Sequence, residues 1–514
     1  MVSPGAPGTP APILAAVLAT AIGLLVRLPT LGFPLLEAAA GKQTHTAMVA
    51  RNLYRGSSSW ARPQVDDIGH PGYFVKEAPV LPAAVAALYG ALGGPHEWVG
   101  RLLPMLAWLA ATPAVVAIAA SFGGGVTPWV AGVWYAIAPL GFVYSRAFMN
   151  DALAVAASIL ALQAALAWRD APRSKGATIA GLWVGLAILL KLHAAFWLAP
   201  AMATLAFWPG EIPGRSRLRF LAAIAIGGAL AAPWYLHAWS VHRDYPIPGA
   251  MTSTGWIDPS LWWRPALYET ILSQEIWMVF TPAGVAVAAL GVLDRRRGGA
   301  AWASLFAWSL GVVLQCLLFA TRLFDEPARR TEYYHLAMVP IGAVWMGLGF
   351  ARILDRLSSR RLLRTVSVAI LALTILAFTA TATVEALAIP REYDRLVENC
   401  SAVRRATPPD DEIAVVSDRP ATVLYYCDRR GLTLLSGEAS TPETLATRDA
   451  AATARIAAEL QRIRYLYLPF PDLLERSPEL ARDLETGWRL RSDLPEGVLL
   501  YERRRTVSGT NAAR

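Results

Sequence analysis

The feature that most constrains this sequence is a series of apolar runs of about 20 residues, the length with which an α-helix crosses the hydrocarbon of a bilayer. Runs of this kind lie near 11–31, 98–121, 127–145, 152–168, 177–190, 194–208, 219–239, 276–293, 300–320, 334–351 and 365–388. They predict about eleven transmembrane helices. Because 55% of the residues are hydrophobic and only 17% are charged, the composition also indicates an α-helical multi-pass membrane protein rather than a soluble one.

Basic residues lie in every second loop between these runs. They follow the fourth, sixth, eighth and tenth runs, around 169–175, 215–219, 295–297 and 352–364. Since Lys and Arg in short loops are kept on the cytoplasmic side, we expect a cytoplasmic N-terminus and an extracytoplasmic chain after about residue 390 in the inner or plasma membrane. The net charge of +9 is then explained by basic residues that orient the protein in the membrane. No basic stripe on a soluble face indicates nucleic-acid binding.

Two segments do not read as spans. Residues 32–97 form an outer loop with short helical stretches at 43–55 and 79–92, which should lie along the membrane surface as juxtamembrane helices. Residues 390–514 alternate helical stretches with short apolar segments such as YLYLPF and GVLLYERR, a pattern typical of a small soluble α/β domain. The predicted domains are therefore a membrane module over 1–389 and an extracytoplasmic α/β domain over 390–514.

Two of the three cysteines, Cys400 and Cys427, lie in the predicted extracytoplasmic domain. An oxidising compartment permits a disulfide between them. Two separate thiols remain an equal alternative, because sequence spacing does not establish disulfide geometry.

Ionisable residues gather at the outer ends of the apolar runs. Only Lys42, Lys76, Lys175 and Lys191 among the 47 basic residues are lysines, and the predicted topology puts all but Lys175 on the outer side. A lysine ammonium suits a phosphate, although snorkelling to lipid headgroups would give the same pattern. The other ionisable residues at these ends include Glu37, His45, Glu77, Arg146, Asp151, His193, Arg330 and His335. Because charges beside a membrane core are costly, their convergence from four separate loops predicts a functional site.

Five strings, taken in order, carry a resemblance to a known family. They are GKQTHTAMVARNLYRG, FVKEAPVLPAAVAALYGALGGPHEWVGRL, YSRAFMNDALAV, LLKLHAAFWLAP and RTEYYHLAMVP. Together they resemble the membrane module of the GT-C glycosyltransferases, most of all the family 39 type, which includes protein O-mannosyltransferases and lipid A aminoarabinose transferases. The resemblance spans residues 11–350 or so. It implies a polyprenyl-phosphate sugar donor, transfer on the outer face of the membrane with inversion at the sugar carbon, and an acceptor glycan, lipid or protein of the cell envelope.

The resemblance also implies roles for single residues. Glu77 matches the glutamate of the family's Glu-x-Pro segment, Asp151 the aspartate that opens the fourth span, and Lys191 the lysine after the fifth. The first loop departs from the family pattern. Where most members have an Asp–Glu pair, this sequence has Lys42 and Gln43, and on another alignment His45 occupies the position of the acid. The identity of the catalytic base is therefore open.

The expected chemistry requires cations and a proton acceptor. Transfer from a lipid phosphate leaves a second negative charge on the departing phosphate, which positive groups must offset. The candidates to bind it are Lys42, Lys76, Arg146, Lys191 and Arg330. The acceptor hydroxyl or amine loses a proton, for which the candidate catalytic groups are, in order, Glu77, Asp151, His45 and Glu37. Carboxylates near His45, His193 and His335 leave a divalent metal open, but no tight ligand motif or other cofactor signal accompanies them.

Three alternatives stay open at this point. A secondary transporter would have ionisable or broken helices near the bilayer midplane, whereas the charges here lie at the ends of the runs. A non-catalytic polyprenyl-phosphate-binding subunit fits the altered first loop. A lipid-linked glycan ligase of another GT-C family would differ in its acceptor. The sequence does not disclose the sugar or the acceptor.

Overall fold

The computed structural model describes residues 10–245, 257–294, 298–324, 332–358, 361–417, 419–433, 462–471 and 478–504. The basic loop 295–297 and Arg330 lie outside these ranges. The chain divides into two compact units. Unit 1 comprises the chain up to Pro34 together with Val75–Ala388, and unit 2 comprises Leu35–Phe74 together with the chain from Ile389 onward.

Unit 1 is helical throughout its described residues. Its helices are α1 (Pro10–Arg27), α3 (Val80–Leu92), α4 (Glu97–Phe122), α5 (Val126–Ile137), α6 (Pro139–Ser145), α7 (Asp151–Asp170), α8 (Ser174–Leu190), α9 (Ala194–Phe207), α10 (Gly214–Ala229), α11 (Ala232–Asp244), α12 (Pro265–Gln274), α13 (Pro282–Val292), α14 (Ala300–Leu318), α15 (Ala320–Phe324), α16 (Met338–Arg356) and α17 (Arg361–Leu387). Shorter helical turns are η1 (Leu28–Thr30), η2 (Pro259–Trp263), the π-helix η3 (Glu275–Phe280) and η6 (Glu332–His335).

Seven helical segments among the described residues are long and apolar enough to cross a membrane. They are Ala11–Thr30, Glu97–Phe122, Asp151–Asp170, Gly214–Asp244, Ala300–Leu318, Met338–Arg356 and Leu362–Leu387. Two bent pairs, α5 with α6 and α12–η3 with α13, raise the total to nine if each is one span. The two predicted runs that remain, 177–190 and 194–208, correspond to α8 and α9, which are only 17 and 14 residues long. The chain is thus a multi-pass membrane protein, and the figure of eleven crossings stays a prediction.

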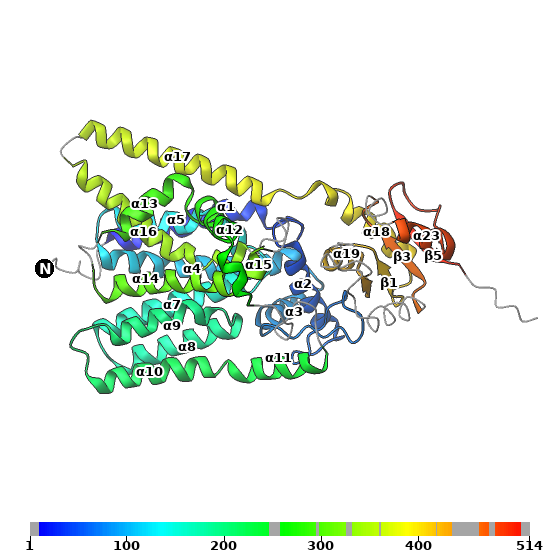
Figure 1. The fold of residues 1–514 in the computed structure, drawn as a ribbon, viewed down its shortest axis with the longest axis horizontal. Helices are drawn as coiled ribbons and strands as arrows, with labels where there is room; N and C mark the ends of the chain where they lie inside the picture. Colours follow the sequence, from blue (N-terminus) through cyan, green and yellow to red (C-terminus); the bar gives the residue numbers. More distant parts are fainter. Residues whose placement is uncertain are drawn as a thin grey trace, which may run out of the picture. The chain divides into compact units, whose positions relative to one another are not determined.

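The helices of unit 1 pack around α16 and α4, with α10 at one edge of the bundle and α17 at the other (Figure 1). Burial agrees with this arrangement. In α16, 78% of the most apolar 18-residue stretch is buried, compared with 11% of the corresponding stretch in Leu362–Leu387. The sides of α17 that no other helix covers carry exposed leucine and isoleucine, which suits a helix that faces lipid.

The predicted straight span over 276–293 is instead sharply bent. The segment Pro265–Phe280 meets α13 at 91°, and Thr281 at the corner has a φ of 63°. Pro282 follows directly and cannot donate a backbone hydrogen bond to the preceding turn. Periodicity alone did not show this corner, because the apolar run continues through it.

Helices α8 and α10 approach each other at a glycine contact. A Cβ at Gly227 would lie 1.9 Å from the carbonyl oxygen of Gly181, and one at Gly185 would lie 2.4 Å from that of Gly227. Small residues that let two backbones touch in this way are typical of membrane helix pairs.

We expect Gly227→Ala to destabilise the protein, because overpacking of a tight contact costs about 1–3 kcal/mol while alanine gains only about 1 kcal/mol in helix propensity. Thermal unfolding in detergent measures the change. The matched control is Gly228→Ala on the same helix, where the new Cβ would meet only the side chain of Ile188 at 3.5 Å. Equal shifts for the two variants would contradict the predicted backbone contact.

Unit 2 contains a five-stranded sheet in the order β2-β1-β3-β5-β4. Its elements are α2 (Ala40–Arg55), η7 (Arg391–Tyr393), α18 (Leu396–Ala406), β1 (Ile413–Val415), α19 (Pro420–Cys427), β2 (Gly431–Thr433), β3 (Tyr465–Leu468), α23 (Pro478–Gly487), β4 (Trp488–Leu490) and β5 (Leu499–Arg503). Strand β1 is parallel to β2 and β3, while β5 is antiparallel to β3 and β4. Strands β1 and β3 are buried along their whole length, as expected for central strands covered on both faces.

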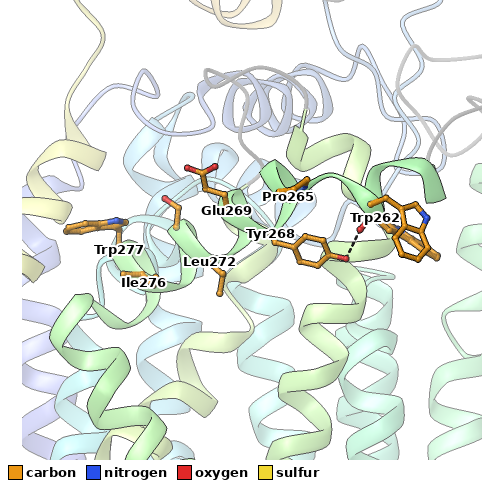
Figure 2. Close-up of a pocket in the computed structure, with 9 residues that line it drawn as sticks. Trp262, Pro265, Tyr268, Glu269, Leu272, Ile276 and Trp277 are labelled. Carbon is orange, nitrogen blue, oxygen red and sulfur yellow. Dashed lines mark hydrogen bonds between the residues drawn. The ribbon is translucent and has the colours of Figure 1, made fainter.

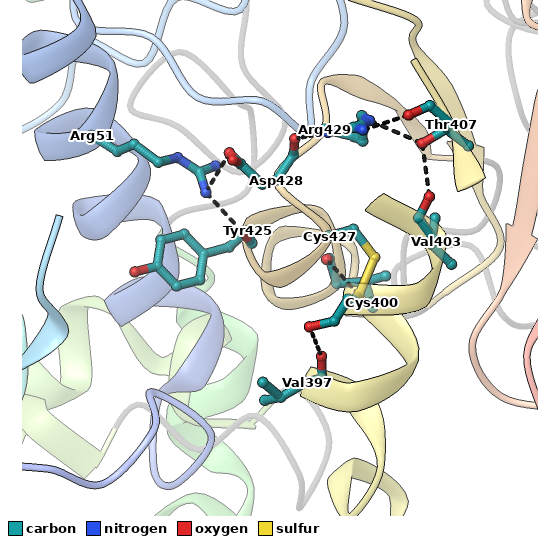
Figure 3. Close-up of a disulfide and its surroundings, with 11 residues drawn as sticks. Arg51, Val397, Cys400, Val403, Thr407, Tyr425, Cys427, Asp428 and Arg429 are labelled. Carbon is teal, nitrogen blue, oxygen red and sulfur yellow. Dashed lines mark hydrogen bonds and ion pairs between the residues drawn. A yellow bond between two sulfur atoms is a disulfide. The ribbon is translucent and has the colours of Figure 1, made fainter. Parts of the chain in front are cut away.

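Helix α2 belongs to unit 2 although it comes from the first loop. The Arg51 side chain donates a hydrogen bond to the carbonyl oxygen of Tyr425 at 2.8 Å and forms an ion pair with Asp428 at 2.9 Å (Figure 3). Arg55 also pairs with Asp428. Burial alone would raise the pKa of Asp428, but the hydrogen bond from Arg55 and the charges of both arginines hold that pKa below its usual range. The predicted domain boundary placed this segment in the membrane module over 1–389. Contacts between α2 and residues near 425–428 could not be seen from their positions in the sequence.

Cys400 and Cys427 form a disulfide that joins α18 to α19 (Figure 3). From the sequence, a disulfide and two separate thiols were equal alternatives. The structure brings the two cysteines together because α18 and α19 pack side by side in unit 2.

We expect Cys427→Ser to destabilise unit 2 by about 2–5 kcal/mol, the usual effect of removing a native disulfide from a small domain. Electrophoretic mobility with and without reductant should differ for the wild-type chain and not for the variant. Cys316→Ser is the control, because Cys316 is a buried free thiol in unit 1 and its loss should leave the mobility difference intact.

Candidate functional site

The centre of the candidate site in unit 1 is a buried ion pair between Lys191 and Asp151. The ammonium of Lys191 donates a hydrogen bond to Oδ1 of Asp151, and both residues are nearly inaccessible to solvent. The lysine nitrogen also lies 4.7 Å from the ring centroid of Tyr333 and 5.5 Å from that of Tyr334. Cation–π contacts of this kind stabilise a lysine that has lost its water.

The helical hairpin α7–α8 explains why these two residues meet. Asp151 is the first residue of α7, and Lys191 follows the last residue of α8. A turn of three residues joins the helices, so the start of α7 and the end of α8 lie at the same end of the hairpin. An acidic residue is favoured in the first turn of a helix, and Lys191 has an extended backbone that ends α8.

The segment 76–78 is held beside this pair. The indole nitrogen of Trp234 donates a hydrogen bond to the carbonyl oxygen of Lys76 at 2.9 Å. The amide of Asn150, next to Asp151, donates to the carbonyl oxygen of Ala78 at 3.4 Å. These contacts join Lys76 and Glu77 to the segment that carries the ion pair.

Tyr235 makes a second connection to the same region. Its hydroxyl donates to the carbonyl oxygen of Ile188 at 2.8 Å, one turn before Lys191, and its phenol interacts electrostatically with Glu77. The structure thus brings together Lys76, Glu77, Asp151 and Lys191, which the sequence analysis had selected from three separate loops. Tyr235, Tyr333 and Tyr334 were not selected, because an aromatic residue at a helix end is also typical of an interfacial belt.

Arg146 is also in unit 1, but its surroundings indicate a structural role. Its guanidinium is fully buried, donates to the carbonyl oxygen of Thr30 at 3.1 Å and lies 5.7 Å from the ring centroid of Phe33. Arg101 holds the same segment by donating to the carbonyl oxygens of Phe33 and Pro34. Phosphate binding by Arg146 stays a prediction, and Arg330 lies outside the described residues.

The remaining candidates, Glu37, Lys42 and His45, lie in unit 2. Nε2 of His45 lies 2.8 Å from Oδ2 of the buried Asp67, and the imidazole ring packs 4.6 Å from the ring of Phe74. Glu37 is buried, and Lys42 lies in the first turn of α2. Asp67 was not among the predicted site residues, because it lies in a polar loop and no sequence motif distinguishes it from the other polar residues there. A histidine paired with a carboxylate is a potential proton acceptor.

Within the described ranges, no group of three or more His, Cys, Asp or Glu side chains could hold a metal ion. His193 packs its ring 4.6 Å from that of Phe319, and Nδ1 of His335 lies 2.7 Å from Oε1 of Glu275. Neither His193 nor His335 belongs to such a group, and the question of metal dependence that the sequence left open is unchanged.

An open groove of about 910 Å³ runs along α12 and η3 (Figure 2). Trp262, Trp263, Tyr268 and Trp277 line it, and Glu269 carries its carboxylate beside Pro265. The Tyr268 hydroxyl donates to the carbonyl oxygen of Trp262 at 2.8 Å. Exposed tryptophan and tyrosine of this kind are typical of a membrane interface.

Comparison with known proteins identifies the fold of this chain. Residues 77–237 match the family model described as dolichyl-phosphate-mannose-protein mannosyltransferase. No curated protein sequence matches the chain. The structure of ArnT from Cupriavidus metallidurans bound to undecaprenyl phosphate superposes with a TM-score of 0.64 at 13% identity, over 96% of this chain and 99% of that one. The chain has the GT-C glycosyltransferase fold.

Two other GT-C structures are similar to it. The oligosaccharyltransferase AglB from Archaeoglobus fulgidus, solved with an inhibitory peptide and a dolichol-phosphate, superposes with a TM-score of 0.56 at 14% identity, over 97% of this chain and 75% of that one. The mycobacterial arabinofuranosyltransferase AftD gives 0.55 at 16% identity, over 97% of this chain and 42% of that one. The GT-C fold is thus common to enzymes with different sugars and acceptors, so the fold alone does not identify either.

Proposed function

We propose that this chain is an inverting glycosyltransferase that takes a sugar from a polyprenyl-phosphate carrier on the outer face of the membrane and transfers it to an acceptor of the cell envelope. The observation that carries the proposal is the buried Lys191–Asp151 pair under two tyrosine rings, at the convergence of separate helix ends in a GT-C fold. ArnT and AglB were each solved with a polyprenyl-type phosphate, which supports the same class of donor here.

In this proposal Lys191 and Lys76 receive the phosphate of the donor. The bond between the sugar carbon and the phosphate oxygen breaks with its electron pair on the phosphate, which gains a negative charge. Preorganised cations in a site that excludes water stabilise such a charge well. Asp151 balances Lys191 while no phosphate is bound, because a buried ammonium without a partner is costly.

Glu77 takes the proton of the acceptor in the same step. The acceptor oxygen or nitrogen forms the new bond to the sugar carbon, and its proton passes to the carboxylate of Glu77. Glu77 is preferred to Asp151, because the carboxylate of Asp151 is already engaged by the ammonium of Lys191. His45 with Asp67 is the second candidate for this role.

The orientation belongs to the proposal as well. Basic loops on alternate sides predict a cytoplasmic N-terminus and an extracytoplasmic α/β domain after residue 390. A reporter fused after residue 400 should be active outside the cytoplasm, and one inserted at 294–299 should be active inside. Two reporters active on the same side would contradict the orientation and the outer-face reaction.

The function is tested on the purified chain in nanodiscs. The protein should release undecaprenyl phosphate from an undecaprenyl-phosphate sugar in the presence of extracted envelope acceptors, and the lipid and glycan profile of cells that lack the protein should show which sugar and acceptor are missing. Tight binding of undecaprenyl phosphate without any transfer would instead indicate a non-catalytic subunit. Absence of binding would contradict the proposal.

A further inference from the structure

A buried chain of polar side chains lies behind the candidate site and takes no part in the proposed reaction. Nδ1 of His335 lies 2.7 Å from Oε1 of Glu275, and Nε2 of the same ring lies 3.8 Å from Sγ of Cys316. His335 and Cys316 are almost completely buried. A buried imidazole keeps this geometry only if both nitrogens have partners. We therefore assign the Nδ1 proton to the bond with Glu275, while Nε2 accepts from the thiol of Cys316.

The carboxylate in this chain comes from an unusual piece of backbone. Glu275 is the first residue of the π-helix η3, which continues to Phe280 and the corner at Thr281. Short π-helices are rare and are frequently found at functional sites. Here the π-helix follows α12 directly, so Gln274 and Glu275 lie at the junction of two helical geometries.

The two residues at this junction hold both ends of the short turn η6. Glu275 binds His335, the last residue of the turn, and the amide of Gln274 donates a long hydrogen bond of 3.5 Å to Glu332, the first. Glu332 also accepts a hydrogen bond from the hydroxyl of Tyr144 at 3.3 Å. In a 3-10 turn the side chains at i and i+3 lie on one side, so Glu332 and His335 together face the helix that holds them.

The middle of the same turn covers the lysine of the candidate site. Tyr333 and Tyr334 lie between the two held ends, and the centroids of their rings are 4.7 Å and 5.5 Å from the ammonium of Lys191. Tyr334 packs also against His193 and Phe319. The position of both rings over Lys191 therefore depends on how firmly the ends of the turn are held.

We propose that Glu275 and His335 are positioning residues: they clamp the turn 332–335 so that Tyr333 and Tyr334 cover the Lys191 ammonium and present it to the phosphate of a polyprenyl carrier. This inference rests on the proposed role of Lys191 in binding that phosphate. The clamp explains why a buried histidine and a buried cysteine lie together with a partly buried glutamate at a π-helix. It adds no catalytic group, because none of the clamp residues touches the reacting atoms.

Cys316 provides a direct measure of the clamp. It is a buried free thiol, whereas Cys400 and Cys427 are bridged. Alkylation of the full-length chain by N-ethylmaleimide in nanodiscs therefore reports how often the region around His335 opens. Binding of undecaprenyl phosphate to the same sample reports the state of the Lys191 site.

Glu275→Ala should accelerate alkylation of Cys316 and weaken the affinity for undecaprenyl phosphate, each by roughly 10-fold to 100-fold, the equivalent of one hydrogen bond to a charged group. Glu275→Gln should restore both values towards the wild type, because its amide oxygen still accepts from Nδ1. The matched control is Glu269→Ala, on the same helix but facing the open groove (Figure 2), which should change neither value.

If Glu275→Ala does not fold, Gln274→Ala serves instead, with smaller changes in the same direction, roughly 2-fold to 10-fold, because its hydrogen bond to Glu332 is long. Unchanged alkylation in the folded variants would disprove the clamp. Faster alkylation with unchanged affinity would disprove its effect on Lys191. A wild-type protein that binds undecaprenyl phosphate but transfers no sugar would contradict the proposed function and not the clamp, whereas absence of binding would contradict both.

Discussion

Asp151→Asn should destabilise the protein by about 3–5 kcal/mol, the usual cost of removing one partner from a buried ion pair. The ammonium of Lys191 would remain buried beside Tyr333 and Tyr334 without a carboxylate. The cation–π contacts with the two rings are already present in the wild-type protein, so they do not offset this loss. Thermal or denaturant unfolding in detergent measures the loss.

The double variant Asp151→Asn with Lys191→Met separates charge balance from catalysis. Replacing both partners of a buried pair by neutral groups is often nearly neutral for stability, so we expect the double variant to recover most of what each single variant loses. Transfer should nevertheless be strongly reduced, because Lys191 is one of the two cations proposed to receive the phosphate. If the double variant is as unstable as Asp151→Asn or Lys191→Met alone, the packing of these two side chains, rather than the balance of their charges, stabilises the fold.

Glu77→Gln should lower sugar transfer by about 10²-fold to 10⁴-fold, the usual contribution of a general base. The side chain keeps its size, and the segment 76–78 keeps its hydrogen bonds from Trp234 and Asn150 to the backbone. Affinity for undecaprenyl phosphate should therefore change little. Initial rates and binding are measured on the same preparation.

His45→Ala is the comparison for this variant. Loss of transfer in His45→Ala with normal transfer in Glu77→Gln would assign the proton to the imidazole that pairs with Asp67. A purely structural role for Glu77, as a cap at the start of α3, predicts instead that Glu77→Gln transfers sugar at a nearly normal rate.

The apolar runs predicted the helical segments of unit 1 well, because the length and hydropathy of a span are properties of a local stretch of sequence. Lys76, Glu77, Asp151 and Lys191 could also be selected, since charges at the ends of apolar runs are rare and costly. The order of the quoted strings predicted the GT-C fold because each string is itself a local stretch of sequence.

Features that depend on contacts between distant residues could not be predicted. The pairing of Lys191 with Asp151 requires the geometry of the α7–α8 hairpin, and the partner of His45 is 22 residues away in a loop. The π-helix Glu275–Phe280 lies across the start of the apolar run 276–293, and the apolar pattern does not reveal the change of helix type. The hydrogen bond from the Arg146 side chain to the carbonyl oxygen of Thr30 likewise joins residues 116 positions apart.

Unit 2 is formed by two segments that are far apart in the sequence and are therefore synthesised at different times. Leu35–Phe74 leaves the ribosome long before Ile389, and the 314 residues between them form most of unit 1. At about 5–20 residues per second, this interval lasts roughly 15–60 s. Throughout it, Arg51 has been made but Tyr425 and Asp428, which it contacts in the finished protein, have not. A nascent chain stopped before residue 389 should therefore leave α2 accessible to protease, and protection should appear only once α19 has emerged.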